Sequence, residues 1–323
     1  MEEHRYYDEA INVINEVKKV IIGKDRCVTL MMAAILAGGH ILIDDIPGVG
    51  KTTLAMAFAK AMCLESRRTQ FTPDVMPSDI LGFSMYSKAD GRFIYQPGTV
   101  MCNLFLADEI NRTSPKTQSA LLEVMEEGSV TVDGVTRKVP QPFIVIATQN
   151  PAGSVGTQLL PESQLDRFMI CVSLGYPTLE DEIAIAKGKS DDLLVQAQNV
   201  IDIPMLIRIR EYVKHIYIND NVYKYICLLS AETRKHEAIQ LGVSTRGTVA
   251  VANMAKAFAF LKNREFVIPD DVEDIFAPVV SHRILLNSKA RISHMDIESI
   301  IAQIKERVKK PRALNGRQRE YVR

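Results

Sequence analysis

The hydrophobic positions in the first half of the chain fall into short apolar runs separated by segments with helical spacing. The short runs predict strands, and the spacing between them is typical of amphipathic helices. Strands are expected at Ile41–Asp44, Arg68–Phe71, Asn103–Ala107, Phe143–Thr148 and Met169–Val172. Helices are expected at Asp25–Ala37, Thr52–Met62, Ser114–Glu127 and about Pro161–Arg167. This alternation favours an α/β fold with a parallel sheet between helices.

Two segments have the alternating pattern and the Asp-Gly turn of a β-hairpin. They are Val130–Thr136 and Phe83–Tyr95, of which the second turns at residues 89–91. An antiparallel hairpin is an addition to a parallel sheet. We therefore expect both hairpins to project from the α/β core.

The pattern changes after Tyr176 and Pro177, and helical periodicity then dominates with almost no strand signal. The expected helices are Thr178–Ala186, Pro204–Ile216, Asn221–Lys235, Thr248–Lys262, Asp270–Val280 and Asp296–Val308. The sequence thus predicts a core over residues 1–176, an all-α domain over residues 177–310 and a basic tail over residues 311–323. We expect solvent around the tail, although it could also contact an acidic partner.

Composition narrows the class of protein. The chain has 323 residues, which favours two domains, and its 39 basic and 39 acidic residues leave no net field that attracts nucleic acid or membrane. Residues 1–7 carry no secretory signal, and the apolar stretch Val28–Ala37 is too short to cross a bilayer, so a buried helix is expected there. No transmembrane segment is therefore expected. The five cysteines are widely spaced, which predicts reduced, buried thiols in a cytoplasmic protein. The six histidines form no metal-binding cluster.

Residues 41–53 carry the clearest chemical signal. An apolar strand leads into a turn rich in glycine, and Lys51, Thr52 and Thr53 then open a helix. This order of strand, glycine loop and helix is that of a phosphate-binding P-loop, in which backbone N–H groups and a lysine bind phosphates. Asp45 stands where the common pattern has its first glycine, whereas Gly48 and Gly50 are present.

Two later strands end in polar residues that suit hydrolysis. The strand before Asp108 and Glu109 predicts one carboxylate for a magnesium ion and one to orient and deprotonate a water molecule. The next strand ends at Gln149 and Asn150, whose amide could bind both the water and a terminal phosphate. Seen alone, the Asp-Glu end is a weak signal that a strand entering a solvated loop would also give, and the end at Gln149, Asn150 and Pro151 favours a plain turn.

Taken together, these motifs resemble the AAA+ ATPases and, among them, the MoxR family. The resemblance covers about residues 22–308 and rests on the following stretches: Asp45-Ile-Pro-Gly-Val-Gly-Lys-Thr52, Gln70-Phe-Thr-Pro-Asp74, Pro77-Ser-Asp79, Leu106-Ala-Asp-Glu-Ile-Asn-Arg112, Pro115-Lys-Thr-Gln-Ser-Ala-Leu-Leu122, Ala147-Thr-Gln-Asn-Pro151, Leu160-Pro-Glu-Ser-Gln-Leu-Asp-Arg-Phe168, Ser244-Thr-Arg246 and Ser281-His-Arg283. It implies an AAA+ P-loop NTPase core followed by a helical lid. In that family the position of Asp45 often carries an acid.

The resemblance also assigns roles. It implies Asn150 as sensor 1, Arg167 as an arginine finger for the ATP of a neighbouring subunit, and Arg246 as sensor 2, in its own or a neighbouring subunit; Arg112 could also face a subunit boundary. An arginine supplied in trans is typically worth roughly 10³ to 10⁵ in rate. The expected catalytic residues are Lys51, Glu109, Asn150, Arg167 and Arg246. The expected ATP-binding residues are Asp45, Pro47, Gly48, Val49, Gly50, Lys51, Thr52 and Thr53. Thr52 and Asp108 are expected to bind Mg²⁺.

The function implied is that of an ATP-driven, chaperone-like remodelling machine. The resemblance implies a ring, as a hexamer, and a client or adaptor protein with a von Willebrand A domain. A nucleic-acid motor is one alternative, although the second hairpin has little basic density and no aromatic platform is evident. The motor subunit of a metal chelatase is another. A nucleotide-gated binding module without turnover is a third, which Asp108, Glu109 and Arg167 disfavour.

Overall fold

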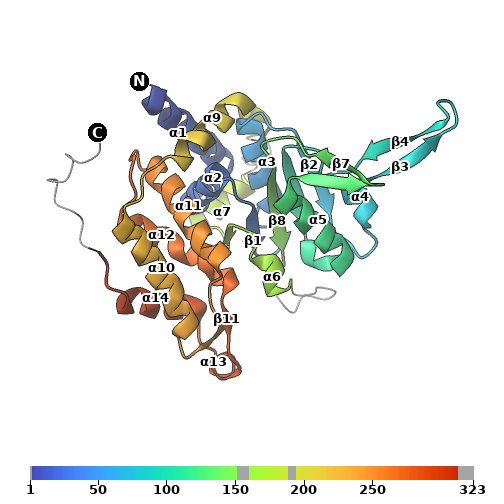
Figure 1. The fold of residues 1–323 in the computed structure, drawn as a ribbon. Helices are drawn as coiled ribbons and strands as arrows, with labels where there is room; N and C mark the ends of the chain where they lie inside the picture. Colours follow the sequence, from blue (N-terminus) through green and yellow to red (C-terminus); the bar gives the residue numbers. More distant parts are fainter. Residues whose placement is uncertain (1, 151–159, 188–193, 312–323) are drawn as a thin grey trace. The chain divides into compact units, whose positions relative to one another are not determined.

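The computed structural model describes residues 2–150, 160–187 and 194–311 (Figure 1). The chain forms two compact units, Met1–Glu211 and Tyr212–Arg323. The boundary predicted after residue 176 lies within the first unit, and the division into core, lid and tail stays a prediction. All of the predicted tail except Pro311 lies outside the described residues.

A five-stranded parallel sheet organises the first unit (Figure 1). Its order is β2 (Ser66–Gln70), β5 (Leu104–Asp108), β8 (Ile144–Gln149), β1 (Ile41–Asp44) and β9 (Ile170–Val172). The three inner strands are almost wholly buried, as expected for a parallel sheet covered on both faces. The predicted α/β architecture is confirmed.

Helices cover both faces because successive strand residues point in opposite directions. Phe105 and Ala107 of β5 lie in one buried cluster with Leu121 and Met125 of α5 (Pro115–Glu127). The residues between them, Leu104 and Leu106, are fully buried as well. Helices α2 (Asp25–Leu36) and α3 (Lys51–Ala61) lie on the side of the sheet opposite α5 (Figure 1).

Helix α5 shows how local sequence sets the ends of an element. The Ser114 hydroxyl accepts a hydrogen bond from the Thr117 backbone N–H at 3.3 Å, and Pro115 occupies the first turn. Gly128 ends the helix in the left-handed region with φ 61°. The prediction of this helix from its cap and periodicity is confirmed.

Two helices of the first unit were not predicted from the periodicity, and a third is shorter than predicted. Helix α1 (Glu2–Val20) opens with a charged turn, yet it buries Ala10, Val13 and Val17. Helix α4 (Pro77–Leu81) is a single short helix, and α6 covers only Glu162–Leu165. A helix with a narrow apolar stripe, or a helix of a single turn, has too weak a periodic pattern to be distinguished from a loop.

Both predicted hairpins are present as antiparallel pairs. The pair β3 (Gly82–Ser87) and β4 (Arg92–Pro97) extends far from the sheet (Figure 1). The pair β6 (Ser129–Val132) and β7 (Val135–Lys138) is anchored, because Val130 belongs to the buried cluster beside α5.

The second unit is helical, as predicted. Its helices are α10 (Asp220–Lys235), α11 (Thr245–Leu261), α12 (Pro269–Val280), α13 (Ser288–Ile292) and α14 (Ile297–Arg307). A two-stranded pair, β10 (Ile239–Leu241) with β11 (Leu285–Leu286), was not predicted because the strands are so short. Helices α7 (Leu179–Ala186) and α9 (Ile203–Lys214) precede this unit, and the last residues of α9 enter it.

Two further predictions from the sequence concern the cysteines and the absence of a membrane-spanning helix. Cys63 and Cys227 are exposed, so the prediction of buried thiols is wrong for these two: Cys63 lies in the turn after α3, and Cys227 is not among the buried residues of α10. Within the described residues, no helix has both the length and the apolar character needed to span a bilayer.

Candidate nucleotide-binding and catalytic site

The P-loop joins β1 to α3. Gly48 and Gly50 adopt φ values of 86° and 90°. A residue with a side chain would be strained in this left-handed backbone conformation. A Cβ atom at either position would meet no neighbour, so backbone conformation and not crowding requires these glycines. The first turn of α3 then presents free N–H groups and a partial positive charge to the loop.

Lys51 is buried at the centre of the loop. Its Nζ donates to the Asp45 carbonyl at 2.6 Å and lies 3.5 Å from both the Gln149 carbonyl and the Asn150 Oδ1. Burial lowers the pKa of Lys51 below its usual value, although the carboxylates of Asp45, Asp108 and Glu109 oppose the shift. The lysine therefore links the P-loop to the end of β8.

Asp45 holds the loop to the end of β9. Its Oδ2 accepts hydrogen bonds from the Ser173 hydroxyl at 3.0 Å, the Leu174 N–H at 2.5 Å and the Gly175 N–H at 2.8 Å. Its Oδ1 accepts from the Ile46 N–H at 2.9 Å. The carboxylate is thus committed to protein donors, and this explains physically why an acid suits the position of the missing first glycine.

Asp108 ends β5, with its side chain only 11% exposed. The Thr148 hydroxyl donates to its Oδ1 at 2.6 Å, and Arg68 of β2 donates to its Oδ2 from Nη2 at 2.7 Å and from Nε at 3.2 Å. The two arginine bonds form a charge-assisted fork on one oxygen. Both oxygens of Asp108 are thus held by side chains of the neighbouring strands.

Glu109 follows with a left-handed backbone, φ 55°. Asn150 Nδ2 donates to its Oε1 at 2.9 Å, whereas Gln70 Nε2 and Arg112 Nη1 each donate to its Oε2 at 2.8 Å. Burial raises the pKa of the Glu109 carboxyl, but the hydrogen bonds from Arg112, Asn150 and Gln70 outweigh burial, so the pKa lies below its usual value. The carboxylate is therefore held charged and well positioned.

Asn150 connects the lysine to the glutamate, because its amide contacts both side chains. Asn111 positions it: the Asn111 amide donates to the Asn150 carbonyl at 3.1 Å, and the Asn150 N–H donates back at 3.4 Å. The structure thus brings Lys51, Asp108, Glu109 and Asn150 together at one edge of the sheet, as their positions at strand ends predict.

The two predicted arginines stand in different units of the chain. Arg167 donates to the Leu122 carbonyl at 2.5 Å and pairs with Glu126 at 3.0 Å, both on α5, and its side chain is 30% exposed. Arg246 lies in the second unit, in the first turn of α11, where Ser244 accepts from the Gly247 N–H at 3.0 Å as the predicted cap. The catalytic roles of both arginines stay predictions.

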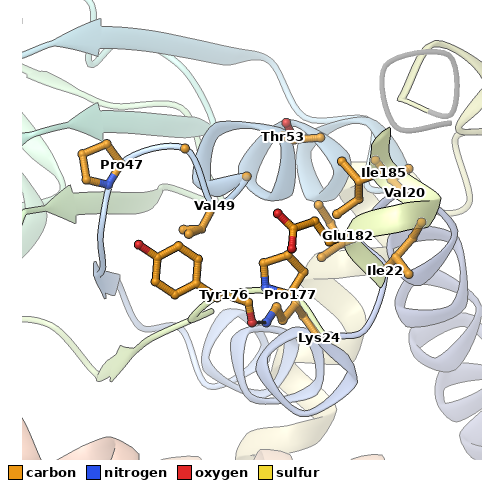
Figure 2. Close-up of a pocket in the computed structure, with 13 residues that line it drawn as sticks. Val20, Ile22, Lys24, Pro47, Val49, Thr53, Tyr176, Pro177, Glu182 and Ile185 are labelled. Carbon is orange, nitrogen blue, oxygen red and sulfur yellow. Dashed lines mark hydrogen bonds between the residues drawn. The ribbon is translucent and has the colours of Figure 1, made fainter. Parts of the chain in front are cut away.

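A cavity of about 390 Å³ adjoins the P-loop (Figure 2). The loop residues 47–50 and Thr53 form one wall, residues 20–22 and Lys24 form a second, and Tyr176, Pro177, Glu182 and Ile185 form the third. Lys24 Nζ donates to the Tyr176 carbonyl at 2.8 Å and joins the last two walls. The cavity has apolar walls and opens onto the phosphate-binding loop, as a nucleoside needs.

Sequence reasoning missed several of these residues. Arg68, Gln70, Asn111 and Thr148 all bond Asp108, Glu109 or Asn150, and only Arg68 stands outside the stretches that carry the family resemblance. A polar residue at the end of an otherwise apolar strand, such as Thr148, is the signal that could have been used.

This combination of a parallel sheet, a P-loop, paired carboxylates and a polar amide on the next strand defines a P-loop NTPase. Residues 40–170 match the model of the ATPase family associated with various cellular activities (AAA), and residues 231–304 match that of the AAA lid domain. Chaperone MoxR1 of Mycobacterium tuberculosis is 35% identical over 92% of this chain and 81% of its own length. Protein MoxR of Methylorubrum extorquens is 29% identical over 86% of this chain and 88% of its own.

A solved structure agrees with these matches. The crystal structure of a protein from Cytophaga hutchinsonii, named there as a candidate ATPase, has a TM-score of 0.89 and 35% identity over 96% of this chain and 97% of its own. The chain belongs to the MoxR family of AAA+ ATPases.

Proposed function

We propose that this protein hydrolyses ATP and uses the energy to remodel a partner protein. The observation that carries the proposal is the path through Asn150, whose amide contacts both the P-loop lysine and the glutamate. A residue at this point can sense a terminal phosphate and position the water that attacks it. Neither contact is needed merely to retain a nucleotide.

Thr52 and Asp108 fit a magnesium ion. They supply a hydroxyl and a largely buried carboxyl group, and oxygen donors of this kind are those that Mg²⁺ prefers. When bound, Mg²⁺ neutralises charge on the phosphate oxygens. Thr148 keeps Asp108 oriented through its hydroxyl.

Glu109 is the proposed base. Its lowered pKa keeps it deprotonated at neutral pH, so it can accept a proton from water. Lys51 neutralises phosphate charge, and Asn150 holds the water and the terminal phosphate. Gln70 and Arg112 position Glu109 through its second oxygen.

We infer in addition that the active form is a ring, expected as a hexamer, because Arg167 is assigned as a finger for a neighbour's ATP. In the single chain this arginine bonds to the Leu122 carbonyl and to Glu126 of its own α5, which suits a side chain that acts on a neighbour's ATP. Arg246 is proposed as sensor 2. The relative named Chaperone MoxR1 supports a client protein, and a partner with a von Willebrand A domain and cytoplasmic localisation are part of the proposal.

The test is the ATPase rate per subunit against protein concentration, with the assembly mass measured in parallel. A rate that rises as a ring forms supports the proposal, whereas a flat, measurable rate in the monomer contradicts the finger in trans. Glu109→Gln should bind ATP without turning it over. Arg167→Ala should bind ATP and lose hydrolysis, with Arg137→Ala on the anchored hairpin as the matched control.

Mixing two inactive variants tests whether the active site is shared between subunits. Lys51→Ala subunits bind no ATP but retain Arg167, whereas Arg167→Ala subunits retain ATP but lack the finger. Mixing them should restore part of the activity if the site is shared between subunits. Inactivity of every mixture would count against a shared site.

A further inference from the structure

The end of the cavity where we expect the nucleotide base combines apolar walls with an acidic side chain. Its walls are apolar there, formed by Val20, Ile22, Pro177 and Ile185, and Glu182 is the acidic side chain among them (Figure 2). Apolar walls bind the faces of any base equally well, because every base has an apolar face. Discrimination between bases therefore depends on the polar groups that meet the base edge.

Glu182 is held on the cavity side of α7. The helix begins at Thr178, whose hydroxyl accepts from the Asp181 N–H at 3.3 Å, and its first turn packs against Gly23. A Cβ atom at Gly23 would lie 2.0 Å from the Asp181 carboxylate, so the loop before α2 and the start of α7 are in close contact. Figure 2 shows the Glu182 side chain pointing from α7 into the cavity.

The Glu182 carboxylate has no hydrogen bond or ion pair with any residue in the described ranges. The other charged side chain of the cavity, Lys24, already donates to the Tyr176 carbonyl at 2.8 Å. A pair of acceptor oxygens, without a protein donor, thus faces the space where the apolar walls would enclose a base. Such a group selects ligands that offer an N–H at that edge.

We propose that Glu182 is the specificity residue for the base, and that it selects adenine by accepting a hydrogen bond from the exocyclic amine. Adenine carries this amine at C6, whereas hypoxanthine and guanine carry an oxygen acceptor at the same position. A carboxylate facing that oxygen places two acceptors against each other and leaves both without a donor. The inference rests on the proposed function, since it assumes that a nucleotide occupies this cavity.

The experiment measures the dissociation constants of ATP, ITP and 2′-deoxy-ATP by competition with a fluorescent ATP analogue. ITP differs from ATP in having an oxygen in place of the amine at C6 and a hydrogen on N1. The wild-type protein should prefer ATP over ITP by roughly tenfold or more, which is what one charge-assisted hydrogen bond at an open site provides. Glu182→Gln should bring the ratio close to one, because a glutamine amide can either accept from the amine or donate to the oxygen.

Glu180→Gln is the matched control, since Glu180 is an exposed acid on the same helix that does not line the cavity. It should keep the wild-type ratio, and both variants should keep the wild-type unfolding midpoint because Glu182 is exposed. An unchanged ATP to ITP ratio in Glu182→Gln overturns the inference. So does a loss of discrimination against 2′-deoxy-ATP alone, because the carboxylate would then contact the ribose.

The two proposals fail in different ways. If the wild-type protein binds none of the three nucleotides, the proposed ATPase function is refuted. If it binds and hydrolyses ATP but Glu182→Gln has the wild-type base preference, only the role of Glu182 is refuted.

Discussion

Replacing Asp45 tests whether this acid contacts the nucleotide or holds the P-loop to the rest of the fold. In the structure the carboxylate accepts four hydrogen bonds from protein donors, two of them from the N–H groups of Leu174 and Gly175. Asp45→Ala leaves those two N–H groups without their acceptor. A buried N–H left unsatisfied costs roughly 1–3 kcal/mol, so the variant should lose about 2–5 kcal/mol of unfolding free energy.

Asp45→Asn is the informative companion, because its carbonyl oxygen can take the place of Oδ2 and keep the bonds to Leu174 and Gly175. The amide nitrogen then faces only the Ile46 N–H, so the expected loss is about 1–2 kcal/mol. Urea unfolding without nucleotide measures both values. Asp8→Ala, an exposed acid on α1, is the control and should change stability by less than about 0.5 kcal/mol.

Nucleotide affinity decides between the two roles. If the Asp45 carboxylate faced the phosphates, its removal would relieve repulsion and both variants would bind ATP more tightly. If it holds the end of β9 to the P-loop, the following residues Tyr176 and Pro177 lose their attachment and Asp45→Ala binds ATP more weakly than Asp45→Asn. Tighter ATP binding by Asp45→Ala, together with unchanged stability, would refute our reasoning.

Three further predictions follow from single contacts. Arg68→Gln removes the counter-ion of Asp108, so the affinity for a fluorescent ATP analogue should reach its plateau at lower Mg²⁺ concentration, whereas Arg67→Gln on the same strand should not alter the Mg²⁺ dependence. Burial lowers the pKa of His40 to about 4, below its usual value near 6.5, so between these pH values the unfolded chain binds a proton that the folded chain does not. The free energy of unfolding should therefore fall as the pH drops through this window, by up to roughly 1.4 kcal/mol per pH unit from this residue. Denaturant titrations of His40→Asn at several pH values should lack that contribution. Asp271 is fully buried and pairs with Arg264, so Arg264→Met should cost about 3–5 kcal/mol of unfolding free energy, measured by urea unfolding, and an effect below about 1 kcal/mol would show that the pair contributes little.

Much of the fold could be predicted from the sequence because the buried strands are continuous apolar runs. Ile41–Asp44 is an example: the run, the glycine turn and the following helix each indicate the same local structure. Helix α1 could not be predicted in the same way, since its charged opening conceals a stripe that becomes apolar only from Ala10 onwards. Its helical form depends on packing against other helices more than on local pattern.

That Asp108, Glu109 and Asn150 meet at one edge of the sheet could also be predicted, because the carboxyl ends of parallel strands lie there and each end carries a polar residue. The cavity beside it could not. Its walls come from residues 20–22 and from α7, segments with no motif, and what joins them is the close contact of Gly23 with Asp181. A contact between residues so far apart in sequence leaves no local signal, so neither the walls nor the position of Glu182 could be read from the pattern.

The geometry around Glu109 links ATP binding to catalysis. Asn150 donates to Glu109 from its only amide nitrogen while its oxygen lies 3.5 Å from Lys51. The Asn150 amide carries two N–H donors, so one can stay on Glu109 while the other meets a terminal phosphate bound at Lys51. The phosphate and the glutamate then share one amide, while Arg112, whose side chain is 41% exposed, holds the other oxygen of Glu109. In the proposed mechanism Asn150 therefore couples the position of the base to the terminal phosphate, and a contact from outside at the exposed Arg112 would be a second way to alter that position.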